Sequence, residues 1–238
     1  MKLAFISDIH GNAIALEAVL NDISKKKVDE IFILGDLCYR GPEPKRSLEL
    51  IRDLKCSVIK GNADEWVVRG IRKGEVPDHV MEKMNQEQEW TVSQLTDSDI
   101  QFLQRLPQDL IKEVEGFRIH AFHATPDNLF ETVSPSESNE ILSERLMTKN
   151  ADVYIYAHIH HSYIRFINGK CLINTGSVGL PFDGVKKPSY ALVELREGNL
   201  EASIVRVDYD MQAVINQIKE SNYPNKDLMI HLLKNASL

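Results

Sequence analysis

Side chains that bind metals follow apolar runs at several places in this 238-residue chain. The apolar run at residues 3–6 leads to Asp8 and His10, one residue apart and just before Gly11. A carboxylate and an imidazole presented together form half of a metal site. Five more residues of this kind end or follow later apolar runs, and they are Asp36, Asn62, His123, His158 and His160.

Carboxylate, imidazole and amide oxygen suit hard or borderline divalent metals rather than thiolate-loving ones. Seven such groups are too many for one ion but suit two, provided that one carboxylate bridges them. Two ions ~3.5–4 Å apart can clamp a phosphoryl group and lower the pKa of a shared water. Asp36 is the expected bridge, because its strand is central in chain order among the first three.

An alternation of strands and helices must position these groups. Strands are predicted at residues 2–7, 30–34 and 56–60, with helices at about 13–26 and 44–54 between them. This order predicts parallel strands joined by crossovers, and the carboxyl ends of such strands meet at one edge of the sheet. The candidate ligands should therefore converge there.

Residues 64 to about 106 change character and lose the strand pattern. They predict two or three helices that form an insertion over or beside the open edge of the sheet. The last of these helices is expected to begin at Thr96, an N-cap with Asp99 three residues on, and to end before Pro107. We treat the insertion as part of one domain spanning residues 1–238.

The second half of the chain predicts hairpins and further helices. The period-two segments end at Gly-containing turns, which favour hairpins. The hairpins are expected at 109–114 with 117–122, 164–167 with 170–174, and 190–195 with 201–207, and a single strand at 153–157. Helices are expected at 138–149, 210–221 and 226–234.

Composition narrows the possible classes of function. The net charge of −7 argues against long nucleic acid as a partner, whereas a small phosphorylated substrate stays open because bound metals add positive charge. Cys38, Cys56 and Cys171 are too few and too scattered for a disulfide framework and suit reduced thiols in the cytoplasm. Neither a secretory signal nor an apolar run of the ~20 residues needed for a membrane span is recognisable. Oligomeric state stays open.

The order and spacing of these motifs over roughly residues 4–180 resemble the calcineurin-like metallophosphoesterase family. The run at 174–179 is similar to one in its compact bacterial and archaeal phosphodiesterase-like branch, and Gly35–Pro42 is similar to a segment of that branch, of protein phosphatases and of diadenosine polyphosphate hydrolases. The resemblance implies an α/β fold, a two-sheet αββα sandwich with a helical insertion.

The resemblance also implies a role for each candidate ligand. Asp8, His10 and His160 would hold one ion, and Asn62, His123 and His158 would hold the other. Asp36 would bridge both ions, and a bridging hydroxide would attack phosphorus in line. Manganese is the expected metal, with iron, zinc, nickel or magnesium as alternatives. Asp36 and Asn62 would thus serve catalysis, and Asn62 and Arg40 would also contact substrate.

One position departs from the family pattern. Many members carry a histidine after Gly-Asn that helps protonate the leaving oxygen, whereas this chain has Ala63. The loss favours substrates with better leaving groups, such as aryl esters or phosphoanhydrides. Asp64, His161 or metal-bound water could replace the missing acid.

The predicted function is hydrolysis of a phosphodiester, phosphoanhydride or phosphomonoester. Alternatives within the enzyme class are a diadenosine polyphosphate hydrolase and a serine/threonine-type protein phosphatase, so the substrate could be a nucleotide or dinucleoside polyphosphate. The alternative from another class is a non-catalytic scaffold that retains the fold. Ala63 favours the scaffold, whereas the complete set of seven ligands favours the enzyme.

Overall fold

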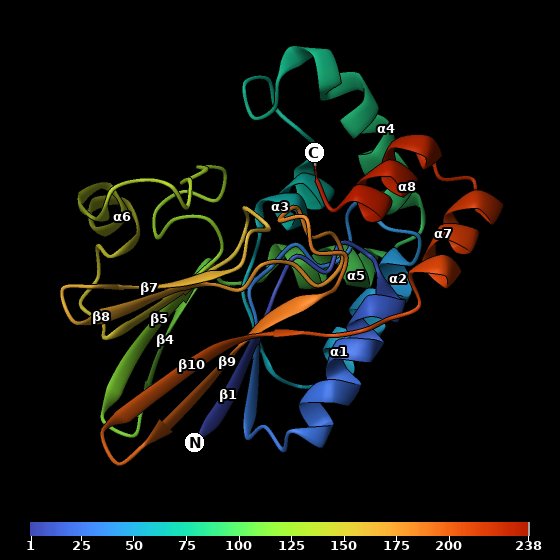
Figure 1. The fold of residues 1–238 in the computed structure, drawn as a ribbon. Helices are drawn as coiled ribbons and strands as arrows, with labels where there is room; N and C mark the ends of the chain where they lie inside the picture. Colours follow the sequence, from blue (N-terminus) through green and yellow to red (C-terminus); the bar gives the residue numbers. More distant parts are fainter. Residues whose placement is uncertain (238) are drawn as a thin grey trace.

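Two five-stranded mixed sheets form the centre of the computed structural model, which describes residues 1–237 (Figure 1). The first sheet has the order β10 (Asn199–Arg206), β9 (Ser189–Arg196), β1 (Lys2–Ile6), β2 (Glu30–Ile33) and β3 (Ser57–Val58). The second has the order β4 (Asp109–Val114), β5 (Phe117–Phe122), β6 (Val153–Tyr156), β8 (Lys170–Asn174) and β7 (Tyr163–Ile167).

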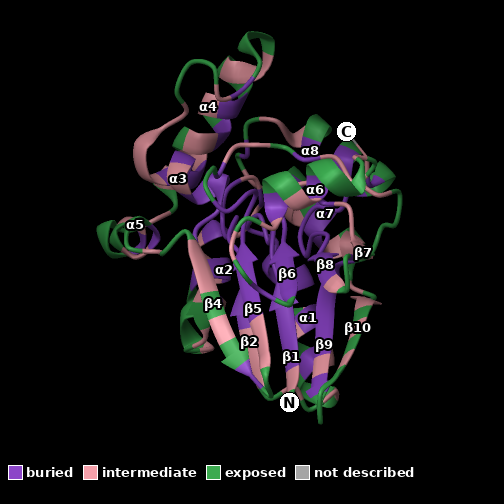
Figure 2. Cartoon of the chain, turned by 90° about the vertical axis from the view of Figure 1, so that its left-hand side faces the viewer, coloured by how far each residue is buried: buried purple, intermediate pink, exposed green. Residues whose placement is uncertain are grey.

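Parallel pairing brings the strand ends together. In the first sheet β1, β2 and β3 run parallel, and in the second sheet β5, β6 and β8 do so. The amino end of β1 lies at the bottom of Figure 2, and the strands parallel within each sheet run upward to loops that lie beneath α3, α4 and α8. The side chains that follow these strands therefore reach one end of the molecule.

The sheets pack face to face through apolar side chains. Phe5 of β1 stacks on Phe32 of β2 with ring centroids 4.8 Å apart, and both belong to a buried cluster that includes Ile119 and Ile155 of the second sheet. Helices α1 (Ala13–Lys25) and α2 (Pro44–Asp53) cover the outer face of the first sheet, and α6 (Asn139–Leu146) packs on the outer face of the second. The predicted αββα sandwich is confirmed.

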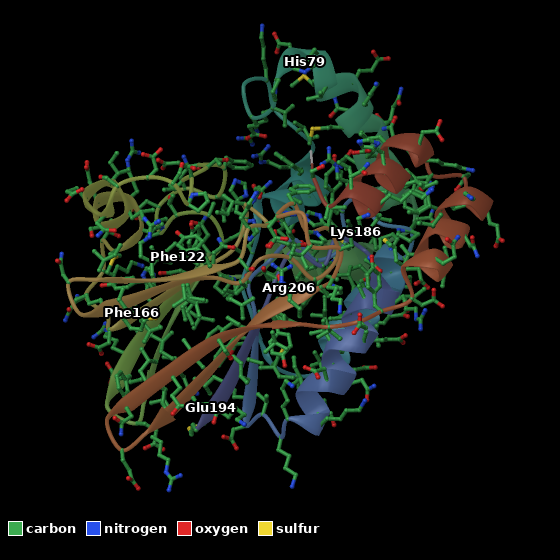
Figure 3. All side chains as sticks on the ribbon, in the orientation of Figure 1. His79, Phe122, Phe166, Lys186, Glu194 and Arg206 are labelled. Atoms are coloured by element: carbon green, nitrogen blue, oxygen red, sulfur yellow. The ribbon has the colours of Figure 1, made fainter. Side chains whose placement is uncertain are left out.

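The predicted helical insertion consists of three helices, α3 (Asn62–Arg69), α4 (Asp78–Ser93) and α5 (Asp97–Gln104). The start of α5 matches the prediction, because Asp99 accepts hydrogen bonds from the backbone N–H and the hydroxyl of Thr96. Helix α4 projects beyond the sheets, and His79 near its start marks the outer tip (Figure 3). The insertion begins earlier than expected, because Asn62 is already its first helical residue.

The predicted strand at residues 56–60 is wrong in length. Only Ser57 and Val58 form β3, at the edge of the sheet. The N–H of Ile59 still bonds to the carbonyl of Ile33, but the N–H of Lys60 turns to the carbonyl of Pro107. The loop after α5 therefore takes over the pairing that a longer strand would have used.

The chain closes with α7 (Met211–Glu220) and α8 (Lys226–Asn235), which lie beside α4 (Figure 1). Trp90 of α4 packs edge-on against Tyr223, with ring centroids 5.0 Å apart, and its Nε1–H donates to Asn222 at 2.8 Å. The insertion and the closing helices therefore support each other. Within residues 1–237, no helix combines the length and the hydrophobicity that crossing a bilayer requires.

Candidate metal centre

The structure brings four candidate ligands from both sheets into one buried group. Asp8 and His10 follow β1, Asp36 follows β2, and His160 follows β6. The Nε2 atoms of His10 and His160 lie 3.2 Å apart, and Asp8 Oδ1 lies 3.2 Å from His160 Nε2 and 3.9 Å from His10 Nε2. One ligand atom of each residue lies within 4.8 Å of the others, so the group has the dimensions of a metal site.

A second group consists of Asn62, His123 and His158. Asn62 Oδ1 lies 2.9 Å from His123 Nε2 and 2.8 Å from His158 Nδ1. Asn62 is the first residue of α3, His123 follows β5, and His158 follows β6. These three side chains come from segments as far apart as 96 residues in the sequence, yet their nitrogen and oxygen atoms meet at one point.

Asp36 lies between the two groups. Its Oδ2 is 3.7 Å from His10 Nε2 in the first group, and its Oδ1 is 3.5 Å from His123 Nε2 in the second. The N–H of Ala63 donates to Asp36 Oδ1 at 2.8 Å and helps to fix this carboxylate. Each oxygen of one carboxylate thus faces a different set of imidazoles.

Backbone carbonyls orient three of the imidazoles. The Nδ1–H groups of His10, His123 and His160 donate to the carbonyls of Tyr39, Leu34 and Leu180 at 2.9, 2.6 and 2.5 Å. In each neutral ring the proton is therefore on Nδ1, and the lone pair of Nε2 faces the site. This arrangement is common around metal-bound histidines, because it fixes the tautomer and the angle of the ring.

The donor set fits a cation. The lone pairs of His10 and His160 face each other across 3.2 Å, which repels unless a positive charge lies near them. Asp8 Oδ1 is buried in the same place and accepts no hydrogen bond from residues 1–237. A buried oxygen without a partner is costly, and a metal ion would satisfy it together with the two nitrogens.

Electrostatics keep Asp36, His10 and His158 in protonation states that bind cations, whereas His123 holds its proton. Burial alone would raise the pKa of Asp36, but the neighbouring imidazoles, above all His123, hold it well below its usual value. Burial and the nearby imidazoles lower the pKa of His10 and of His158 to about 4. For His123, burial is outweighed by Asp36 and Asp8, which raise its pKa to about 9. A cation in the second group would compete with that proton.

Five of the seven candidate ligands adopt left-handed backbone conformations. Their φ angles are 50° for Asp8, 49° for His10, 55° for Asp36, 69° for His158 and 55° for His160. Residues other than glycine rarely do so, at a cost of roughly 1–2 kcal/mol each. Strain of this kind gathers at functional sites, where the surrounding contacts hold it.

Several supporting residues escaped the sequence prediction. Ser7 Oγ donates to Asp8 Oδ2 at 2.6 Å and lies 2.6 Å from the Thr175 hydroxyl. Ser177 Oγ donates to the carbonyl of Asp8 at 2.8 Å, and the Thr132 hydroxyl lies 3.3 Å from His158 Nε2. The only sequence signal for any of these supporting residues was the run at 174–179. This run contains Thr175 and Ser177 and packs against Ser7 and Asp8.

The remaining predicted site residues lie around this centre. Asp64 is fully buried, and its oxygens accept the N–H groups of Asp36, Leu37 and Gly61 at 2.8–2.9 Å. Burial and the charge of Asp36 raise the pKa of Asp64 to about 7. His161 Nδ1 donates to the carbonyl of Ile159 at 2.8 Å. Proton transfer by Asp64 or His161 stays a prediction.

The two-sheet fold is that of the metallophosphoesterases. Residues 1–198 match the calcineurin-like phosphoesterase superfamily domain, and the chain belongs to that superfamily. It is 31% identical to the uncharacterized protein MJ0912 of Methanocaldococcus jannaschii over 239 residues, which is 93% of each chain. A metallophosphoesterase from Sphaerobacter thermophilus has a similar structure, with a TM-score of 0.79, 24% identity and 99% of each chain covered.

A shorter match falls on a symmetrical bis(5'-nucleosyl)-tetraphosphatase of Baumannia cicadellinicola. The two are 34% identical over 87 residues, which cover 34% of this chain and 30% of that protein.

Proposed function

We propose that this protein is a phosphoesterase that holds two divalent ions, one in each ligand group, with Asp36 shared between them. The position of Asp36 carries the proposal, because its two oxygens face His10 and His123 at 3.7 and 3.5 Å. Asp8, His10 and His160 would complete the first site, and Asn62, His123 and His158 the second. Ions bound there would withdraw charge from a phosphoryl group and lower the pKa of water.

The residues of the chain would orient the substrate for in-line displacement. Hydrogen bonds within the chain fix the carbonyl-bound imidazoles and Asp36, so a phosphoester would require little reorganisation of these groups. Arg40 follows Tyr39, whose carbonyl accepts the hydrogen bond of His10, and a guanidinium at this place can bind two phosphoryl oxygens. Ala63 supplies only a backbone N–H, so substrates whose leaving oxygen needs no proton should react best.

The proposed class of substrate follows from the lack of a proton-donating side chain at Ala63. Aryl phosphodiesters and phosphoanhydrides have good leaving groups, and a dinucleoside polyphosphate is a phosphoanhydride. The partial similarity to a symmetrical bis(5'-nucleosyl)-tetraphosphatase supports this second candidate activity. Manganese is the proposed metal, and the cytoplasm the proposed location.

The test begins with protein stripped of metal by a chelator. It should be inactive on bis-p-nitrophenyl phosphate and regain activity with manganese, with about two ions per chain by elemental analysis. Asp36→Asn should reduce turnover to less than about a thousandth, because it weakens both sites together. A panel of dinucleoside polyphosphates, cyclic nucleotides and phosphopeptides would then rank substrates. A protein that binds no metal and cleaves none of these would be a scaffold.

A further inference from the structure

Arg40 has a fixed backbone beside the candidate metal centre. The residue before it, Tyr39, pairs with His10, and a Cβ on the next residue, Gly41, would lie only 1.9 Å from the carbonyl oxygen of His10. Arg40 itself has a φ of 77°, which is unfavourable for a long side chain. The loop around His10 therefore determines where the arginine side chain starts.

The Nε atom of the Arg40 guanidinium makes a hydrogen bond, whereas its two Nη groups make none within the described part of the chain. Its Nε–H donates to Glu87 Oε2 at 3.0 Å. Neither Nη group makes a hydrogen bond with residues 1–237. Neither of them is fully buried, so both Nη groups are accessible to solvent. The side chain as a whole is 19% exposed. The fork of donors that binds phosphate in a bidentate manner is thus free.

Glu87 is fixed from three directions. It lies on α4 of the insertion and is 2% exposed. Besides Arg40, its carboxylate accepts hydrogen bonds from the hydroxyl of Tyr39 at 3.3 Å and from Asn225 Nδ2 at 3.2 Å. Asn225 is the residue at the N-cap position of α8, and the Tyr39 hydroxyl shares its proton between Glu87 and the carbonyl of Met84, which lies 3.0 Å away. The ligand loop, the insertion and the closing helices meet at this carboxylate.

We propose that Glu87 is a positioning residue for phosphate binding, which orients the Arg40 guanidinium so that its two Nη groups receive the phosphoryl oxygens of the substrate. This inference rests on the proposed phosphoesterase function. A buried ion pair contributes little to stability compared with apolar packing, so stability alone gives no reason for a carboxylate at position 87. The orientation of a flexible arginine does give a reason, because bidentate binding of phosphate requires a guanidinium in a fixed position. The insertion would then form part of the substrate site.

The decisive variant is Glu87→Gln, which keeps the shape of the side chain but weakens its hold on Nε. We expect roughly a tenfold rise in KM for bis-p-nitrophenyl phosphate and in the Kd for inorganic phosphate, since a mobile arginine has to be ordered on binding. Metal content should not change. Glu89→Gln is the matched control, because Glu89 is exposed on the same helix and its side chain makes no hydrogen bond within residues 1–237.

A double-mutant cycle separates positioning from a structural role. Arg40→Ala should weaken phosphate binding at least as much as Glu87→Gln, and the double variant should be no worse than Arg40→Ala alone. Additive losses would overturn the proposal. A lower KM in Glu87→Gln would also overturn it, because Glu87 would then act only by neutralising Arg40.

Two further measurements keep the outcome decisive. If Glu87→Gln fails to fold, Arg40→Lys replaces it, since lysine keeps the charge without a planar fork; full phosphate affinity in that variant would contradict the proposal. If the wild-type protein cleaves no phosphoester, the proposed function fails, yet calorimetric titration of the manganese-loaded protein with inorganic phosphate still decides the role of Glu87. Absence of phosphate binding by the wild type would overturn the role as well.

Discussion

Gly61 lies against Asp36 so closely that a single methyl group should disturb the candidate metal centre. A Cβ at position 61 would lie 2.1 Å from Asp36 Oδ1 and 2.5 Å from its backbone nitrogen. Carbon atoms and their neighbours normally keep about 3.5–4 Å apart, so Gly61→Ala has to move Asp36 by roughly 1 Å. The φ of Gly61 is −103°, which alanine adopts without strain, so the effect is steric alone.

The magnitude follows from overpacking and from the position of the shared ligand. Overpacking of a well-packed site costs about 1–3 kcal/mol, which lowers Tm by roughly 2–12 °C for a domain of this size. A shift of about 1 Å in a group that positions the reaction can reduce the rate about a hundredfold. We therefore expect Gly61→Ala to lose about two orders of magnitude in kcat/KM, together with part of its bound manganese.

The assay combines elemental analysis, hydrolysis of bis-p-nitrophenyl phosphate and thermal unfolding. Gly198→Ala is the matched control, because Gly198 has a φ of 78° but an added Cβ would meet no atom of the described part of the chain within 4 Å. That variant should lose about 1 kcal/mol through the backbone alone and keep full metal content and activity. If Gly61→Ala also keeps its metal and its rate, the contact with Asp36 does not position this carboxylate and the reasoning is refuted.

Three further predictions concern stability and metal affinity. Ser7→Ala removes the hydroxyl that donates to Asp8 Oδ2 at 2.6 Å and should weaken manganese binding 10- to 100-fold, roughly, in a direct titration; unchanged affinity would contradict this role. Manganese at a hundredfold excess over its Kd should raise the free energy of unfolding by about 2.7 kcal/mol per site, and the gain should shrink in Asp36→Asn. The pKa of Asp99 is lowered to about 2, because hydrogen bonds from Thr96 and Lys45 outweigh burial. Its folded pKa lies below the unfolded value, so its stabilising effect of up to about 2 kcal/mol is present above pH ~4 and is lost as the pH falls towards 2. Asp99→Asn should therefore reduce the loss of unfolding free energy at acid pH, as measured by urea unfolding.

Much of the fold was predictable because local patterns determine its elements. Short apolar runs and Gly-containing turns predicted the hairpins, and the N-cap at Thr96 predicted the start of α5. What the patterns did not contain was pairing between distant segments. Strand β9 inserts antiparallel beside β1, with Leu192 opposite Ala4, although 188 residues separate them. Such neighbours depend on how the two sheets pack.

For the candidate site, residue type and placement could be predicted, but the contacts could not. Strand-end position indicated Asp8, His10 and His160, because parallel strands present their carboxyl ends together. No local signal indicated that Glu87, in a polar stretch that suits a solvated helical face, is 2% exposed and holds Arg40. Its burial depends on Asn225 and Tyr39, which reach it from opposite ends of the chain.

The run at 176–179 has a physical role that its resemblance to a family motif did not reveal. The N–H groups of Val178 and Gly179 donate to the carbonyls of Ser7 and Asp8 at 3.0 and 2.9 Å, and a Cβ on Gly179 would lie 1.8 Å from the carbonyl oxygen of Ile9. These contacts hold Asp8 in its left-handed conformation, with one carboxylate oxygen that has no hydrogen-bond partner among residues 1–237. Contacts within the fold therefore offset the backbone strain at Asp8, and this does not require a bound cation. A cation would then find its donors already in place, which strengthens binding because fewer groups have to be ordered.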